Sequence, residues 1–458
     1  MVVDQDLNLV PWLATMTTAD QKELVFDLRS DATFSDGSPL TPEDVIWSWE
    51  RHFDEELASQ LSYFLFNFDS IKKTGANQVT ITLKSPDPTF PYLAMFVHIH
   101  QKAFGEAAGL DLGAPGTGVM GTGPYTISDH SPDAGLTATA RTGYWGTMPK
   151  AQSVKLQVIT APDTLRLALS DNGVAGTFGI SLTSAKQLST TENVLVGTCE
   201  NSTSTFLSFP VRVSPFDDLN VRKAFAHCFD REGLVQALLN GGGIPATSVS
   251  TPNQWKPLVG PEGAVSFLSS LPAYGFDLAA AKASLDASAH AGGFTTSMKV
   301  PSDDPEFVKI SQVLAENLKQ IGVTLNIEQV SVDTYNTEVY SDKVEALWLV
   351  RLNPVVPDPT DYLGIILPTS AAEPGGYNFA YFSNKEVDEL LTDQASQLGD
   401  ARIESLKRVA QIAQEQLPYV PIYWPNYGMA INNGIRFNDF NMYTTSMPWA
   451  QNVGVAAT

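Results

Sequence analysis

Two short patterns carry residue types that could bind a metal ion or a dinucleotide. His98 and His100 would share one face of a strand, but no cysteine or carboxylate pattern accompanies them. Segment 116–121, Gly-Thr-Gly-Val-Met-Gly, has the letters of a dinucleotide fingerprint, yet residues 123–128 favour a strand where that motif needs a helix. We therefore expect a structural role for both patterns, with no metal site and no cofactor.

Paired carboxylates are the other candidates for chemistry. Pairs 217–218 and 303–304 directly precede expected helices, where capping explains them. Asp358 and Asp361 form the only loop pair worth testing for glycosidase chemistry, which needs two carboxylates. The sequence has no Gly-x-Ser-x-Gly elbow, His-Glu-x-x-His pair or phosphate loop. We therefore expect no catalytic residues and no enzyme.

Aromatic side chains at strand ends and in loops are what the sequence offers a ligand. Such side chains give a pocket contact area at low entropic cost, although most large aromatics belong to the core. The candidates are Tyr63, Trp145, Trp255, Trp348, Tyr381, Tyr423, Trp424 and Tyr427.

Composition limits the kinds of partner. The chain has 458 residues, of which 50 are acidic and 28 basic, giving a net charge of −22. That charge opposes binding to nucleic acid or to anionic membranes. With 43% hydrophobic and 17% charged residues the chain is typical of a folded globular protein, and at about 150 residues per domain it has room for two or three domains. The apolar stretches are too short for a membrane span.

The two cysteines, Cys199 and Cys228, are too few for a zinc quartet. They form either one disulfide or two buried thiols, and the cellular compartment would decide between these alternatives.

Local patterns predict mixed α and β structure from the outset. Thr41 precedes Pro42, Glu43 and Asp44, which is typical of a capped helix start, and a helix is expected over 42–52. Apolar and polar residues alternate over 78–84 and 323–327, as in half-buried strands. Further strands are expected at 123–128, 154–159, 345–352 and 419–424, helices at 162–170, 304–322, 385–397 and 401–416, and an irregular stretch at 244–273.

Several recognisable motifs are distributed along the chain. They are Phe26-Asp-Leu-Arg29, the stretch from Phe34 to Val45, Gly121-Thr-Gly-Pro-Tyr125, Tyr144-Trp-Gly146 followed by Pro149, the stretch from Pro215 to Arg231, and Asn384 with Val387-Asp388. This succession resembles the family 5 extracellular solute-binding proteins, the peptide, nickel and oligosaccharide receptors of ABC importers. The similarity spans nearly the whole chain.

The resemblance implies an α/β fold, a two-lobed periplasmic-binding-protein-like clamp of class II, enlarged cluster C type. Placed on this chain, an inserted subdomain of lobe I covers 1–122, lobe I covers 123–200 and 425–458, and lobe II covers 203–424. The two crossovers fall near Ser202 and Pro425. Ligand binding would stabilise the closed form of such a clamp.

The resemblance also implies a function and a location. The protein would capture a peptide or similarly sized ligand and deliver it to an ABC permease, as a monomer without nucleic acid partners. It would be extracellular or periplasmic, lipid-anchored or free in its full-length form. The alternative is a secreted α/β hydrolase or glycosidase acting in the cleft between the lobes.

Two departures from the family pattern stand out. The chain begins almost at Val10-Pro-Trp-Leu-Ala14, where family members first have a strand, a helix and a loop, so we expect a truncated or misassigned start. Peptide receptors of the family place an aspartate three residues after a strand tryptophan resembling Trp348, to pair with the amino group of the peptide. Here that residue is Arg351, which suits an anion or an internal ion pair.

The expected ligand contacts combine these observations. Trp348 would be a stacking wall, and Arg351 or Asp358 the charge anchor. Tyr423 and Trp424 would lie near the hinge, and Tyr63 would reach the ligand from the insert. If the protein is exported, a disulfide from Cys199 would tie a strand near one crossover to the helix that carries Cys228.

Overall fold

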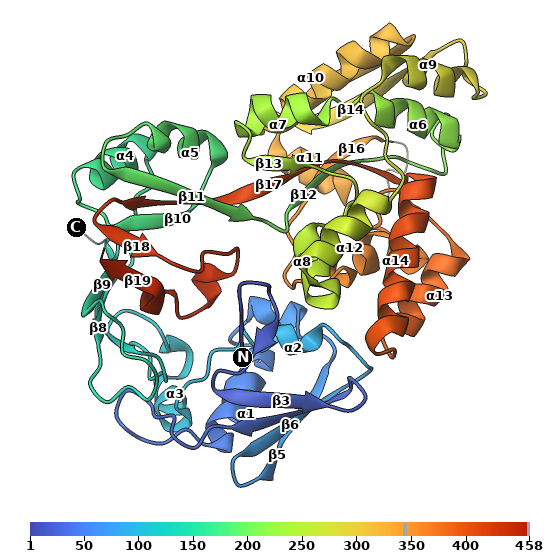
Figure 1. The fold of residues 1–458 in the computed structure, drawn as a ribbon. Coiled ribbons are helices and arrows are strands. Elements are labelled where there is room, and N and C mark those ends of the chain that lie inside the picture. Colours follow the sequence, from blue (N-terminus) through green and yellow to red (C-terminus); the bar gives the residue numbers. More distant parts are fainter. Residues whose placement is uncertain (342–345, 456–458) are drawn as a thin grey trace. The chain divides into compact units, whose positions relative to one another are not determined.

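A computed structural model describes residues 1–341 and 346–455 and has a mixed α/β fold (Figure 1). The chain divides into two compact units, unit 1 comprising Met1–Cys199 and Tyr427–Thr458, and unit 2 comprising Glu200–Asn426. These boundaries lie beside the expected crossovers near Ser202 and Pro425. The finer division into an insert and a first lobe stays a prediction, and the end of its 425–458 segment, residues 456–458, lies outside the described residues.

The first part of unit 1 is a four-stranded antiparallel sheet of order β3-β4-β6-β5. Its central strand β6 buries Val79, Ile81 and Leu83, so the predicted half-buried strand is confirmed. Helix α1, Pro42–Glu50, packs on this sheet and begins with the capping box that Thr41 and Asp44 form, as predicted. The strands are β3 (Ala14–Thr18), β4 (Glu23–Leu28), β5 (Phe68–Gly75) and β6 (Gln78–Leu83).

The rest of unit 1 has a three-stranded sheet, β7-β8-β9, and two strands that pair with β17 (Tyr419–Asn432): β10, which pairs with its second half, and β11. Leu169, Ile180, Leu188, Val194 and Ala430 form a shared core there. Helix α4 has the predicted bounds. The elements are β1 (Val2–Val3), β2 (Leu9–Val10), α2 (Phe90–Leu93), α3 (Lys102–Ala108), β7 (Tyr125–Ser131), β8 (Gly135–Ala140), β9 (Ser153–Leu156), α4 (Pro162–Ser170), β10 (Gly176–Ile180), α5 (Leu182–Ser189), β11 (Val194–Glu200), β18 (Ile435–Phe437) and β19 (Val453–Val455).

Unit 2 is built on an antiparallel sheet in which β12 (Ser204–Ser208) lies between β16 (Trp348–Leu352) and the first half of β17. Strand β13 (Gly243–Pro245) pairs with β17. A second pair, β14 (Phe294–Pro301) and β15 (Val323–Val330), is parallel and connected by α10 (Pro305–Gln320). The other helices are α6 (Leu219–His227), α7 (Arg231–Leu239), α8 (Pro252–Ser270), α9 (Leu278–Asp286), α11 (Val332–Val339), α12 (Thr360–Ile366), α13 (Lys385–Gln394) and α14 (Gly399–Gln416).

Two sequence-based expectations about secondary structure are wrong. Residues 244–273 are not irregular, because α8 runs through them as two helical pieces that meet at Gly260, whose φ is 73°. Pro252 and Pro261 each stand in a first helical turn, where a proline costs no hydrogen bond, so they do not signal a loop here. His98 and His100 do not lie on a strand, since only His100 makes an isolated bridge, to Gly121. Glu345, the expected start of β16, lies outside the described residues.

Candidate functional site

Thr205, Arg351 and Tyr423 stand side by side in the sheet of unit 2. Thr205 on β12 is the direct partner of Arg351 on β16 and of Tyr423 on β17. Directly opposed residues of neighbouring antiparallel strands share one face of a sheet. The long-range strand pairing therefore gathers a hydroxyl, a guanidinium and a phenol on one face.

Helix α10 supplies two carboxylates to the same place. Arg351 donates from Nη1 to Asp304 Oδ2 at 2.9 Å and from Nη2 to Glu306 Oε2 at 2.7 Å. The Tyr423 hydroxyl donates to Glu306 Oε2 at 3.0 Å. Asp304 is also the N-cap of α10, because its Oδ1 accepts the Phe307 N–H at 3.0 Å. We call Thr205, Asp304, Glu306, Arg351 and Tyr423 the Arg351 cluster.

The Arg351 cluster is partly open to solvent and carries a net negative charge. The side chains of Arg351, Asp304 and Glu306 are 30%, 21% and 38% exposed. Burial works against the charge on Arg351, but Asp304 and Glu306 outweigh it and raise its pKa. Burial, assisted by Glu306, raises the pKa of Tyr423, which keeps the phenol neutral. One guanidinium and two carboxylates leave a formal charge of minus one.

The Thr205 hydroxyl is the unsatisfied member of the cluster. Thr205 is 0% exposed, and its Oγ1 makes no hydrogen bond within the part of the chain that the structure describes. Buried hydroxyls in folded proteins normally have a partner. The hydroxyls of Ser204 and Ser208 on the same strand are likewise unsatisfied within the described residues, so this property is shared along β12.

The two predicted tryptophans lie in the core of unit 2. Trp348 is 2% exposed and meets the ring of Tyr335 edge-on, with 5.4 Å between centroids. Trp424 is 4% exposed and donates its indole N–H to the carbonyl of Ser248 at 3.1 Å. In this structure neither ring has an open face for a ligand to stack on.

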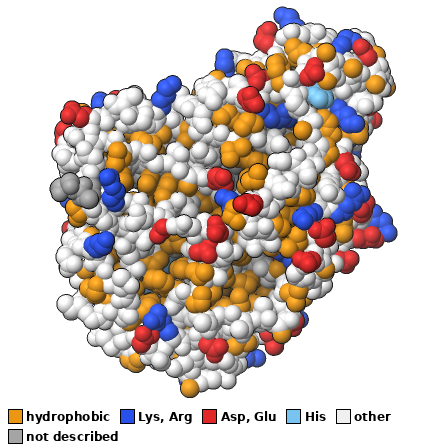
Figure 2. Space-filling view, viewed as in Figure 1, with side chains coloured by type: hydrophobic (Ala, Val, Ile, Leu, Met, Phe, Trp, Pro, Cys, Tyr) orange, Lys and Arg blue, Asp and Glu red, His pale blue; other side chains and the backbone are white. Residues whose placement is uncertain are grey.

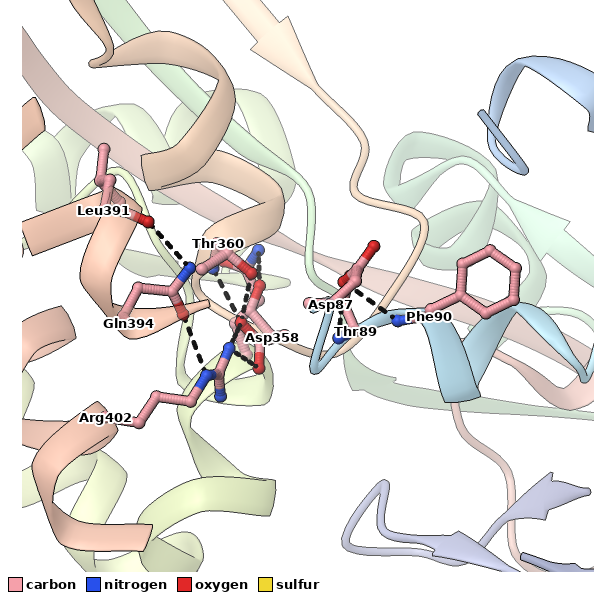
Figure 3. Close-up of polar contacts among 9 residues, drawn as sticks. Asp87, Thr89, Phe90, Asp358, Thr360, Leu391, Gln394 and Arg402 are labelled. Carbon is pink, nitrogen blue, oxygen red and sulfur yellow. Dashed lines mark hydrogen bonds and ion pairs between the residues drawn. The ribbon is translucent and has the colours of Figure 1, made fainter. Parts of the chain in front are cut away.

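Asp358 has an internal partner. Its carboxylate pairs with Arg402 at 2.9 Å and accepts the Thr360 N–H at 2.9 Å, and the residue is 3% exposed (Figure 3). Arg402 also donates to Gln394. Asp358 is therefore held as a structural residue here, and Arg351 remains as the partly exposed charged candidate.

Asp361 is also held internally. Its Oδ2 accepts the backbone N–H groups of Val355 and Val356. Burial raises its pKa to about 6, against the lowering effect of those two N–H groups, and nearby Asp358 adds to the rise. Both carboxylates of the loop pair thus have structural explanations, so the geometry does not favour the hydrolase alternative.

Tyr63 is the one predicted contact in unit 1. It ends the 3₁₀ helix Gln60–Tyr63 and is 82% exposed, so its ring is available to a ligand or to solvent. Its contact with a ligand stays a prediction, because each unit is described by itself.

Unit 1 also contains an apolar cavity of about 530 Å³. Hydrophobic side chains gather around the position that Figure 1 marks as the N-terminus, and basic side chains are scattered over the face in view (Figure 2). No group of three or more His, Cys, Asp or Glu side chains within residues 1–341 and 346–455 could hold a metal ion. The lining of the cavity includes Trp12, Phe26, Trp49, Met95, His98, His100 and Met447.

Cys199 and Cys228 are not joined by a disulfide in the structure, so the disulfide considered from the sequence is not formed in it. Cys228, the C-cap of α6, lies in the core of unit 2 and is 0% exposed, and burial raises the pKa of its thiol to about 12. Cys199 lies on β11 in unit 1.

Sequence reasoning missed Asp304, Glu306 and Thr205 as parts of the site. Asp304 was expected only to cap a helix, which it does, and its second carboxylate oxygen pairs with Arg351. The one available signal was the internal ion pair considered for Arg351, which the structure contains. It did not say which acidic residues were the partners.

The chain thus consists of two compact units, joined where it passes from β11 to β12 and again along β17. The model of the bacterial extracellular solute-binding proteins, family 5 middle, matches residues 8–373, and the chain belongs to this family. The expected family is thus confirmed.

Similar proteins cover most of the chain at low identity. Heme-binding protein A of Haemophilus influenzae is 23% identical over 434 residues, covering 88% of this chain and 76% of the relative. Glutathione-binding protein GsiB of Escherichia coli O157:H7 is 22% identical over 437 residues, covering 92% of this chain and 81% of the relative.

Solved structures confirm the expected fold. HbpA2 from Haemophilus parasuis matches with a TM-score of 0.86 at 20% identity, covering 100% of this chain and 92% of that chain. DppA from Helicobacter pylori in complex with peptide STSA matches with a TM-score of 0.69 at 19% identity, covering 98% and 89%. Among the described residues, no helix is both long and apolar enough to cross a membrane.

Proposed function

We propose that this protein is the receptor of an ABC importer, which captures a peptide or a similarly sized solute and hands it to the permease. The observation that carries the proposal is the division of the chain into two compact units linked at two points, 199/200 and 426/427. Units linked in this way can close around a ligand, and the ligand then stabilises the closed form by its higher affinity for it.

The ligand class rests on the names of similar proteins and on this chain's own side chains. The relatives and structures include binding proteins for glutathione, heme and a peptide. In unit 2 the partly exposed side chains of Arg351, Asp304 and Glu306 offer charged groups, and in unit 1 Tyr63 offers an exposed ring. A peptide has the polar ends and apolar side chains that suit such groups.

The remaining parts of the proposal concern how and where the receptor works. The protein binds its ligand without chemical change, acts as a monomer and works outside the cytoplasm. It is lipid-anchored at the cell surface or free in the periplasm in its full-length form. Its partner is the permease of an importer.

Native mass spectrometry of the protein as purified tests this function, followed by thermal shift assays against peptides, sugars and metal chelates. We expect a retained or added ligand of peptide size and a raised melting temperature, because a ligand that binds only the folded state stabilises it. A protein that retains no ligand and is stabilised by none of the three classes would contradict the proposal.

A further inference from the structure

We propose that Asn172 is a site of spontaneous deamidation, a covalent change that replaces its side-chain amide by a carboxyl group. The pair Asn172-Gly173 lies in the turn between α4 and β10 of unit 1 (Figure 1). Two further Asn-Gly pairs, Asn240-Gly241 and Asn433-Gly434, occur in the chain. The three pairs have the same two residue types but differ in their hydrogen bonds, and this difference selects Asn172.

The reaction requires a backbone nitrogen that can reach a side-chain carbonyl carbon. The nitrogen of Gly173 attacks Cγ of Asn172, so a bond forms between them while the bond from Cγ to Nδ2 breaks. The Gly173 nitrogen loses its proton, and Nδ2 leaves as ammonia, which produces a cyclic succinimide. Water then opens the ring at one of its carbonyl carbons and gives aspartate or isoaspartate. Glycine favours the attack because it has no Cβ to hinder the approach.

The turn at Asn172 leaves both reacting groups free. Asn172 and Gly173 are exposed, and within residues 1–341 and 346–455 neither the Gly173 N–H nor the Asn172 side chain makes a hydrogen bond. The neighbouring backbone bonds, from Asn172 N to Leu169 O at 3.4 Å and from Val174 N to Ala168 O at 3.0 Å, involve other atoms. The attack at this pair therefore requires no hydrogen bond of the reacting groups to break.

At Asn240 the attacking nitrogen is held by the end of α7. The Gly241 N–H donates to the carbonyl of Val235 at 3.1 Å, and the Gly242 N–H donates to that of Leu239 at 2.8 Å. This turn must open before the nitrogen can attack. Asn240 has a φ of 51°, close to the 58° of Asn172, so the left-handed backbone alone does not distinguish the two pairs.

At Asn433 both reacting groups are held. The Gly434 N–H donates to Asn432 Oδ1 at 3.0 Å, and Asn433 Nδ2 donates to Asn193 Oδ1 at 3.1 Å. The Asn433 N–H also donates to the carbonyl of Asn193, at 2.8 Å. One hydrogen bond changes an equilibrium by about two- to tenfold, so the two or three bonds at Asn240 and Asn433 should slow the attack about tenfold or more.

Deamidation at Asn172 would change unit 1 at the edge of a core. Asp171 is the C-cap of α4, so the product would place a second carboxylate at the helix end where the dipole already disfavours negative charge. Isoaspartate would also add a methylene group to the backbone between α4 and β10, whose residues Leu169 and Ile180 belong to one buried cluster. The modification would thus alter both the charge and the chain path beside that core.

The experiment follows all three Asn-Gly pairs in one sample of the full chain. The protein is incubated at mildly alkaline pH, and cleavage after lysine and arginine places the pairs on separate peptides for mass spectrometry. A sample taken at the start corrects for deamidation during digestion, and the chain in guanidinium chloride gives the rates of the unfolded sequence. In the folded protein we expect Asn172 to react at about its unfolded rate, and Asn240 and Asn433 about tenfold or more below theirs.

Two variants change the attack and the hydrogen bonds separately. Gly173→Ala adds a Cβ that would lie 3.4 Å from the carbonyl oxygen of Ala168, an ordinary contact, so the variant should fold and lose most of the reaction at Asn172. Asn193→Gly removes the side-chain partner of Asn433 at a position whose φ is 62°, which glycine adopts without strain. It should raise the rate at Asn433 about twofold or more and leave Asn172 unchanged.

The inference is wrong if Asn172 in the folded protein reacts as slowly as the other two pairs, or if all three keep their unfolded rates. A reaction at Asn172 that stays fast in Gly173→Ala would contradict attack by the following nitrogen. An unchanged rate at Asn433 in Asn193→Gly would contradict the role given to the hydrogen bonds. None of these outcomes depends on which ligand the protein binds.

Discussion

Arg402 and Asp358 form an ion pair inside unit 2, with 2.9 Å between Nη2 and Oδ2 and side chains that are only 7% and 4% exposed. Arg402 Nε also donates to Gln394, and Asp358 Oδ1 accepts the N–H of Thr360. The pair therefore joins α14, α13 and the first turn of α12 through one desolvated contact (Figure 3). A buried ion pair is tolerated only when its remaining lone pairs and N–H groups also have hydrogen-bond partners, and most of those of Arg402 and Asp358 do.

Removing one partner of this ion pair should destabilise the protein strongly. Arg402→Met leaves the Asp358 carboxylate buried without its counter-ion, so we expect a loss of about 3–5 kcal/mol in the free energy of unfolding. Urea unfolding followed by circular dichroism measures it. Arg408→Met is the control, because Arg408 forms an exposed pair with Glu386, with side chains 42% and 52% exposed, and should cost less than about 1 kcal/mol. Equal losses in the two variants would mean that burial does not govern the energy of the pair.

Asp361 should give unit 2 a distinctive pH response. Its pKa is raised from 3.8 to about 6 in the folded protein, so between these values the folded state holds a proton that the unfolded chain has released. Stability from this group is therefore lost as pH rises from about 4 to 6, by about 3 kcal/mol at most. Asp361→Asn cannot titrate, so the stability of the native protein relative to this variant should fall across that window. Parallel stability curves for the two proteins would contradict the raised pKa.

Capping residues in the sequence predicted correctly where helices begin. The capping box of Thr41 and Asp44 and the N-cap of Asp304 need only a few consecutive residues, and both are confirmed. Helix α8 was missed because its three prolines and Gly260 look like loop signals, although Pro252 and Pro261 stand where the two helical pieces begin and only Pro257 lies inside a piece.

The candidate site was predicted only in part because its contacts are distant in the sequence. Arg351 finds Asp304 and Glu306 at separations of 47 and 45 residues. The neighbours of Thr205 come from β16 and β17, which lie far along the chain. Residue types identified Arg351 and Tyr423 as candidates, but the strand register that places Thr205 between them cannot be read from spacing.

The start of the parallel pair β14 and β15 requires glycine at position 293. Gly293 has a φ of 80°, and a Cβ there would lie 2.1 Å from the carbonyl oxygen of Gly322, which precedes β15. Gly293→Ala should therefore cost about 2–4 kcal/mol through backbone strain and overpacking. Gly292→Ala is the neighbouring control, since its Cβ would meet nothing within 4 Å. Thermal and urea unfolding of both variants measures the difference, and equal stability would contradict the close approach.

Two histidines of unit 1 should make stability depend on pH in the opposite direction from Asp361. Burial lowers the pKa of His52 and His100 to about 4, and the nearby Arg51 and His98 add to the effect. The unfolded chain takes up protons near pH 6.5 while the folded unit does not, so the stability that these groups affect is lost as pH falls from about 6.5 towards 4. His100→Gln should reduce that loss.

Hydrogen exchange followed by mass spectrometry, corrected for the intrinsic effect of pH, can follow peptides from α1 and β5 in unit 1 and from α12 in unit 2. At low pH we expect the amides of unit 1 to be better protected from exchange in His100→Gln than in the native protein, because burial disfavours the protonated, charged form of histidine. At neutral pH we expect the amides of unit 2 to be better protected in Asp361→Asn, because burial disfavours the deprotonated, charged form of aspartate. A change of the same sign in both variants would contradict this assignment.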